Sequence, residues 1–296
     1  MLKLDNKHSV SLKICQKPVI RLFCLALLIN LLINVAAIAD PGVKNDIVYR
    51  FGVVPQFEQH KIFRIWVPIL QKLEEETGIR FELVGSNQIP VFETKFLAGE
   101  FDFAYMNPYH IIQAHDTQGY KPLVKDGSRS LRGIIVVQKN SPIRTIQQLK
   151  NELLVFPSAS ALGASLIPRA EFSRLYGIEV KTKYVKTHTS VYLHVLKGLA
   201  IAGGGVASTL QRQKPQIRDS LRILYETETV NPHPIVAHPR VPVEHLNKVK
   251  AAFLALGLRE DGIALLSKIP MFAVKEASIS DYANLRNLNL DEYSKR

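Results

Sequence analysis

The apolar and polar positions along this chain alternate between strand-like and helix-like segments. A β-branched run at 47–54 predicts a strand, and apolar residues at helical spacing then predict a helix ending at Thr77, with Gly78 as its cap. The alternation is typical of βα units around a mostly parallel sheet, so we expect an α/β fold. Further strands are predicted at 79–84, 101–106, 121–125, 131–138, 153–156, 180–185 and 221–225, and further helices at 91–98, 146–149, 163–176, 190–196, 243–256 and 261–269.

Two segments, near 127–133 and 226–234, connect the halves of this pattern. They predict a discontinuous first lobe (40–130 and 232–296) and a continuous second lobe (131–231), joined by a two-strand hinge. Each lobe is expected to hold a mostly parallel sheet flanked by helices, and the residues after 269 read as a polar tail. A mature chain of this length can bury a full apolar core in each lobe.

The N-terminus has the layout of a secretory signal peptide. Five basic residues precede an uncharged apolar run at 22–32, which is followed by the small-x-small site Ala37-Ile38-Ala39 and by Asp40-Pro41. We expect residues 1–39 to be removed after Ala39 and the mature protein to lie in the periplasm. The alternative is an uncleaved membrane anchor, because 22–39 approaches the length that crosses a bilayer.

Composition and motifs exclude several function classes. Both cysteines, Cys15 and Cys24, precede the predicted cleavage site, which leaves the mature chain without disulfides or thiol chemistry. Its net charge falls from +12 to +8 and favours an anionic ligand, whereas no Lys/Arg block indicates nucleic acid. No H-E-x-x-H, G-x-S-x-G or P-loop motif occurs, and the histidines at 233, 238 and 245 match no metal template. We therefore expect no enzyme activity, no cofactor and no metal.

Several segments together resemble a known family. They are Phe51-Gly52-Val53-Val54-Pro55-Gln56, Trp66-Val67-Pro68, the 101–109 segment, Phe156-Pro157-Ser158 and Thr187-His188-Thr189-Ser190-Val191. In this order they resemble the phosphate-, phosphite- and phosphonate-binding (PhnD-like) proteins of ABC importers, which have the two-lobed type II periplasmic binding-protein fold. The resemblance implies a monomer that binds a small anionic ligand between its lobes and delivers it to a membrane permease. A sensory protein signalling to a membrane histidine kinase and, less favoured, a periplasmic enzyme remain alternatives.

The first candidate site follows the predicted strand at 101–106. Asn107-Pro108 is expected to start a helix there, and ligands of open α/β sheets bind where strands end. The resemblance implies an aromatic ligand contact at this point, by Tyr105 or Tyr109. The alternative is that both tyrosines are core residues.

The second candidate site is the turn at 158–165. Relatives carry a Ser-Thr-Ser-Gly loop here, whereas this chain has Ala161, Leu162 and Gly163 at the aligned positions. The nearby hydroxyls are those of Ser158, Ser160 and Ser165, and backbone amides can still form an anion cradle. Small residues that permit close helix–strand packing are the equal alternative.

His188 is the strongest single candidate, because it occupies the position of a ligand-binding histidine in the resembled family. Thr187, Thr189 and Ser190 adjoin it, although Thr189 or Ser190 could instead be a helix N-cap. Ile201 aligns with a family aspartate, which argues against an aminoalkylphosphonate ligand. The glycines at 203–205 indicate either close ligand approach or a bend at the hinge.

Overall fold

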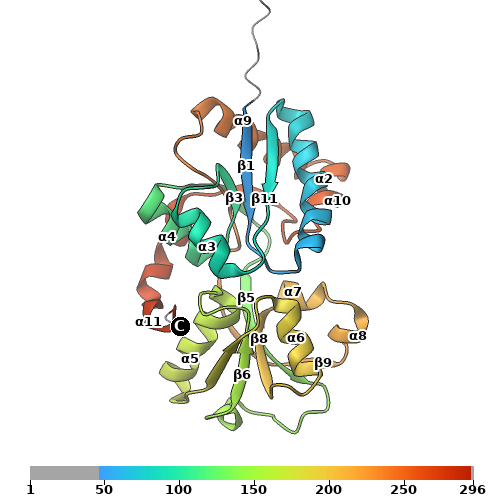
Figure 1. The fold of residues 1–296 in the computed structure, drawn as a ribbon, viewed down its shortest axis with the longest axis vertical. Helices are drawn as coiled ribbons and strands as arrows, with labels where there is room; N and C mark the ends of the chain where they lie inside the picture. The colour runs from blue at the N-terminus through green and yellow to red at the C-terminus, as the bar shows by residue number, and fades with distance from the viewer. Residues whose placement is uncertain (1–46, 295–296) are drawn as a thin grey trace, which may run out of the picture. The chain divides into compact units, whose positions relative to one another are not determined.

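A computed structural model describes residues 47–294 and arranges their strands in two sheets (Figure 1). The first sheet, with its helices, is called lobe 1 below. Its strands follow the order β11-β4-β10-β3-β1-β2. They are β1 (Val48–Val53), β2 (Arg80–Val84), β3 (Phe103–Tyr105), β4 (Lys121–Asp126), β10 (Ile235–Ala237) and β11 (Val274–Glu276).

The second sheet, with its helices, is called lobe 2. Its strands follow the order β7-β6-β8-β5-β9. They are β5 (Leu131–Gln138), β6 (Leu153–Phe156), β7 (Lys181–Tyr184), β8 (Ala202–Val206) and β9 (Leu221–Val230). The exact lobe limits given above stay predictions, and the predicted signal peptide at 1–39 lies outside the described residues.

Helices join the strands within each lobe, as the sequence pattern predicts. Helix α2 buries Trp66, Ile69 and Leu73 and ends at Gly78, whose φ of 68° is the left-handed conformation expected of a glycine cap. Helix α2 spans Gln59–Thr77, and lobe 1 also contains α3 (Ile89–Leu97), α4 (Pro108–Gln118), α9 (Val243–Leu256), α10 (Glu260–Leu266) and η3 (Ile279–Leu288). The C-terminal α11 (Asp291–Ser294) contacts lobe 1 through Asp291 and lobe 2 through Glu292. Lobe 2 contains η1 (Ile146–Leu149), η2 (Leu162–Leu166), α5 (Ile167–Tyr176), α6 (His188–Leu196), α7 (Ala207–Gln211) and α8 (Pro215–Arg218).

The sheets contain antiparallel strands, but most strands of each sheet share one direction, as predicted. Strand β10 runs antiparallel to β3 and β4, and β5 runs antiparallel to β8 and β9. The chain crosses between the lobes before β5 and before β10, so each of these strands enters its sheet against the direction of its neighbours. The prediction of a polar tail after residue 269 is wrong, because this part of the chain forms β11 and η3 and buries Tyr282 and Leu285.

The chain crosses between the lobes at 127–130 and 231–234, and side chains join the second crossing to β4 and η3 of lobe 1. Lys125 Nζ donates to Asn231 Oδ1 at 2.8 Å, and Asn231 Nδ2 donates to the Asp281 carbonyl at 2.5 Å. Strand β9 continues to Val230 because it stays paired with β5 up to Leu131, so the second crossing is shorter than predicted. A separate contact joins α5 to α11, where Arg174 pairs with Glu292 at 2.6 Å.

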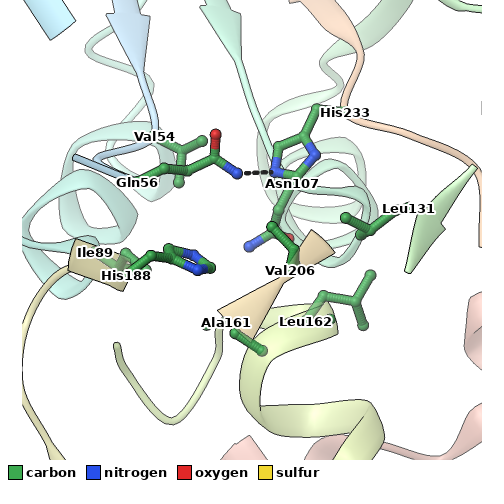
Figure 2. Close-up of a pocket in the computed structure, with 12 residues that line it drawn as sticks. Val54, Gln56, Ile89, Asn107, Leu131, Ala161, Leu162, His188, Val206 and His233 are labelled. Atoms are coloured by element: carbon green, nitrogen blue, oxygen red, sulfur yellow. Dashed lines mark hydrogen bonds between the residues drawn. The ribbon is translucent and has the colours of Figure 1, made fainter. Parts of the chain in front are cut away.

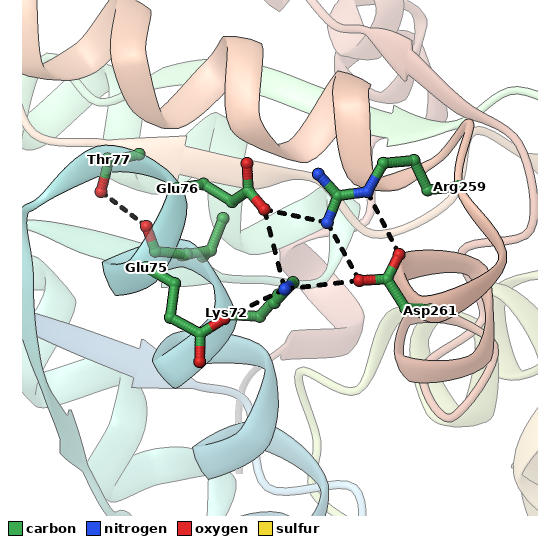
Figure 3. A network of polar contacts seen from close by, with 7 residues as sticks. Lys72, Glu75, Glu76, Thr77, Arg259 and Asp261 are labelled. Carbon is green, nitrogen blue, oxygen red and sulfur yellow. Dashed lines mark hydrogen bonds and ion pairs between the residues drawn. The ribbon is translucent and has the colours of Figure 1, made fainter.

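A surface network of ion pairs joins α2 to the start of α10 (Figure 3). Lys72 lies 3.4 Å from Asp261, and Arg259 contacts both Glu76 and Asp261 at 2.9 and 3.0 Å. These groups remain in contact with water, so the network adds little to stability and is weakened by salt. Glu75, which pairs with Lys72, is exposed. Within residues 47–294, no helix is both long and apolar enough to cross a membrane.

Candidate functional site

A cavity lies where strand ends of lobe 1 and lobe 2 face each other (Figure 2). Its volume of about 20 Å³ is enough for one ordered water molecule. Lobe 1 and the second crossing contribute Val54, Gln56, Ile89, Asn107 and His233, and lobe 2 contributes Leu131, Ala161, Leu162, Gly163, Ala164, His188 and Val206. Most of these residues lie in the turns and helix starts that follow a strand, the region where open α/β sheets bind ligands.

Four polar side chains line this otherwise apolar cavity. Gln56 Nε2 lies 3.2 Å from His233 Nε2, and His233 stacks on Tyr105 with ring centroids 5.2 Å apart. Asn107 Oδ1 accepts from the amides of Tyr109 and His110, both at 2.9 Å. Its Nδ2 group lies 3.0 Å from His110 Nε2, which leaves one of its two hydrogens to donate. His188, the fourth, points its ring toward the centre of the cavity. Among the described lining residues there is no lysine, arginine or carboxylate.

Both cavity histidines are neutral at neutral pH. Burial lowers the pKa of His188 to about 3. Burial also lowers the pKa of His233 to about 3, with smaller repulsive contributions from His110 and His188. The cavity therefore offers hydrogen-bonding groups without net charge.

This burial makes folding stability depend on pH. Unfolded histidine titrates near pH 6.5, so below that pH the unfolded chain takes up protons that the folded chain rejects. Stability is therefore complete above pH 6.5 and is lost as the pH falls toward 3, by about 2 kcal/mol per histidine at pH 5. Urea unfolding at pH 7 and pH 5 measures the loss. His233→Gln is expected to remove about half of this loss. A loss as large as that of the wild type in the His233→Gln variant would contradict this assignment.

The wall at 161–164 is the start of a helix that packs unusually close to the sheet. A π-helical turn, η2, precedes α5 here, and the first amides of a helix have no partner within it. Gly204 of β8 permits the approach, since a Cβ on this residue would lie 1.9 Å from the Ala164 carbonyl oxygen. Gly133 of β5 does the same against the Gly163 carbonyl, at 2.0 Å.

The glycine run at 203–205 therefore serves helix packing. Gly203 and Gly205 face Val191 and Tyr192 of α6 just as Gly204 faces η2, and all three lie inside a paired strand. Neither a hinge bend nor ligand approach accounts for them. Ile201 packs in the hydrophobic cluster with Val180 and Tyr184, away from the cavity, so its alignment with an aspartate gives no information about the ligand.

Two of the ten predicted site residues, Asn107 and His188, line the cavity. Of the two tyrosines left open, Tyr105 supports His233 from behind and borders a neighbouring cavity. Tyr109 turns to the C-terminal segment, where its hydroxyl donates to Asp291 Oδ1 at 2.5 Å. Burial and this bond raise the pKa of Tyr109 to about 12.

The other predicted residues make local hydrogen bonds beside the cavity. Ser158 and Ser160 bond each other through their hydroxyls at 3.1 Å, and Ser165 Oγ accepts from Arg169 Nε at 3.1 Å. Thr187, and not Thr189 or Ser190, is the N-cap of α6, because its side chain accepts from the Ser190 amide. Thr189 Oγ1 accepts from Gln213 Nε2 at 3.3 Å.

Sequence reasoning missed Gln56 and His233. Gln56 lies in the turn after the first strand, and this place near a strand end was an available signal. His233 had no such signal, because it lies in a proline-flanked crossing and reaches the cavity only through the fold. The sequence also provided no signal for a neighbouring cavity, which shares Val54 and Gln56 with the first cavity and is lined by the cationic Arg212 and Lys268.

Known proteins share both this fold and this sequence pattern. A binding-protein component of an ABC phosphonate transporter from Pseudomonas aeruginosa superposes with a TM-score of 0.76 at 14% identity, over 84% of this chain and 87% of that chain. PhnD1 from Prochlorococcus marinus, in complex with methylphosphonate, gives 0.76 at 16% identity, over 85% and 100%. A Xanthomonas citri protein bound to ATP gives 0.64 at 16% identity, over 84% and 99%.

These likenesses confirm the predicted two-lobed type II periplasmic binding-protein fold. The family itself is shown by sequence, because the model for "ABC transporter, phosphonate, periplasmic substrate-binding protein" matches residues 51–282, most of the chain. This protein therefore belongs to the family of periplasmic substrate-binding proteins of phosphonate ABC transporters.

Proposed function

We propose that this protein captures a small phosphoryl-type oxyanion (phosphate, phosphite or a phosphonate) in the cavity between its lobes and delivers it unchanged to an ABC permease. The cavity of about 20 Å³ holds only a water molecule, so the lobes must move apart about the two crossings to admit the ligand. The observation that carries the proposal is the cavity itself. Facing strand ends bring together His188, Asn107 and the amides of the 161–164 turn, and no described carboxylate lines the cavity to repel an anion. The methylphosphonate complex of the structurally similar PhnD1 supports the same ligand class.

Neutral groups can hold an anion in such a place. Burying a charge is costly unless hydrogen bonds replace its hydration. The first-turn amides of η2 and the Nδ2 group of Asn107 supply donors, and the positive end of the η2–α5 helix favours negative charge. Apolar neighbours such as Leu162 and Val206 exclude water and so strengthen these bonds.

Export and partners complete the proposal. We propose that the signal peptide is cleaved after Ala39 and that the mature protein is a monomer. The intact mass of exported protein would test the cleavage site, and its sedimentation would test the monomeric state. Delivery to a permease is the family's role, and signalling to a membrane histidine kinase stays a prediction that neighbouring genes would test.

Calorimetric titration of the mature protein tests the ligand class. Methylphosphonate, phosphite and phosphate are the probes, and an amino acid such as arginine serves as a chemically unrelated control ligand. Saturable binding of at least one of the oxyanions, without binding of arginine, is the expected result. Failure of all three to bind, in protein shown by mass spectrometry to carry no retained ligand, would contradict the proposal.

A further inference from the structure

Behind His188 lies a buried polar group whose hydrogens can be assigned. His188 Nδ1 lies 3.3 Å from Thr209 Oγ1, and the Tyr192 hydroxyl lies 2.7 Å from the same oxygen. Thr209 Oγ1 in turn lies 2.8 Å from the carbonyl oxygen of Val206, three residues earlier in the chain. All three side chains are almost completely buried, so water does not complete these contacts.

Thr209 has one hydroxyl hydrogen for three contacts. The Val206 carbonyl can only accept, and at 2.8 Å it takes that hydrogen. The Thr209 oxygen must then accept from both Tyr192 and His188. If Tyr192 instead donates to the Val206 carbonyl, at 3.3 Å, Thr209 donates to Tyr192 and still accepts from His188. If Thr209 donated to His188 Nδ1 instead, it would give up its 2.8 Å bond to the Val206 carbonyl for a longer bond of 3.3 Å.

The hydrogen count thus places the histidine proton on Nδ1. A neutral imidazole then carries a lone pair on Nε2, the opposite ring nitrogen. Within residues 47–294, the side-chain hydrogen bond of His188 is the one at Nδ1, and the ring faces the cavity (Figure 2). The free nitrogen therefore presents an acceptor to whatever occupies the cavity.

We propose that Thr209 is a positioning residue that makes His188 a hydrogen-bond acceptor, so that the site selects oxyanions carrying a P–OH group, the singly protonated form, over fully ionised ones. This inference rests on the proposed function, because it concerns the protonation state of the same ligand. A P–OH group donates to Nε2 while its other oxygens accept from Asn107 and the η2 amides. A fully ionised anion would set an oxygen lone pair against that of Nε2.

The surroundings support a fixed neutral histidine. The cause of the low pKa of His188 is burial alone, with no charged side chain contributing. The titratable groups around it are Tyr192 on its own helix and His233 across the cavity, and burial keeps both neutral. Gly205 preserves the arrangement, because a Cβ there would lie 2.2 Å from the Tyr192 hydroxyl.

Binding measured against pH tests the selection. Methylphosphonate is titrated calorimetrically from about pH 6.5 to about pH 9.5, because an alkylphosphonate loses its second proton at a higher pH than a phosphomonoester, which does so near pH 6. Once the ligand is mostly dianionic, its apparent Kd is expected to rise about tenfold per pH unit. Sulfate, which has no proton to donate in this range, is expected not to bind. A flat or falling Kd, or sulfate bound as tightly as methylphosphonate, would overturn the inference.

Variants at Thr209 and a spectroscopic measurement separate positioning from packing. Thr209→Val keeps the shape but removes the acceptor for Nδ1–H, so it is expected to weaken binding and flatten the pH profile. Thr209→Ser keeps the hydroxyl and is expected to retain the wild-type profile. Nitrogen NMR of histidine-labelled wild-type protein is expected to show His188 protonated at Nδ1. Protonation at Nε2 would overturn this inference, whether or not any oxyanion binds. Failure of all oxyanions to bind would by itself overturn only the proposed function.

Discussion

Replacing His188 by alanine is expected to raise the Kd for methylphosphonate about 10- to 100-fold, because hydrogen bonds to charged groups contribute about 1.5–3 kcal/mol and each 1.4 kcal/mol is tenfold. His188 is the cavity side chain at the start of α6, and its ring is buried on all sides except toward the cavity. Truncation removes the only ring nitrogen that faces the ligand from this helix and leaves an enlarged, more weakly complementary space. Calorimetric titration at pH 7.5 measures the change.

His194→Ala is the matched control for this variant. His194 lies six residues later on the same helix, and its Nδ1 contacts the Ser190 carbonyl at 2.7 Å instead of the cavity. Its replacement is expected to leave the Kd within about twofold of the wild-type value, since it loses only a partly exposed local contact. An unchanged Kd in folded His188→Ala protein would remove His188 from the site.

Gly204→Ala is expected to destabilise the protein by about 3 kcal/mol or more and to lower Tm by about 10 °C. The new Cβ would lie 1.9 Å from the Ala164 carbonyl oxygen and 2.5 Å from the Phe156 ring. The carbonyl belongs to the backbone of η2 and cannot rotate away, so relief requires moving the helix start off β8. The same movement displaces the amides of the 161–164 turn, and we expect ligand affinity to fall as well. Thermal unfolding with and without methylphosphonate measures both effects.

Gly85→Ala provides a comparison in which the new methyl group has room to be accommodated. Its Cβ would meet the end of the Gln59 side chain at 2.7 Å, and that flexible side chain can turn away. Its Tm is expected to stay within about 2 °C of wild type, the effect of an ordinary surface substitution. Equal Tm values for the two variants would show that the close approach of β8 and η2 does not constrain residue 204.

The sequence predicts the local structure well where the determining interactions are local. Apolar spacing and Gly78 define α2, and Asn107 starts α4 because its own side chain caps the following amides. The fold class follows from the order of these elements together with the family resemblance. Short strands such as β10 and β11 escape prediction, because three residues carry too little pattern and their pairing depends on distant partners.

The composition of the site was decided by tertiary structure. Asn107 and His188 could be predicted because each lies at the turn from a strand into the start of the following helix. Gln56 and His233 meet across 177 positions of sequence, and whether Tyr109 faces a ligand or Asp291 depends on where the C-terminal segment packs. The proton on His188 is likewise set by Thr209, which a different helix supplies. The sequence alone determines the elements and the family, whereas contacts between distant segments, which local patterns do not encode, determine the chemistry of the cavity.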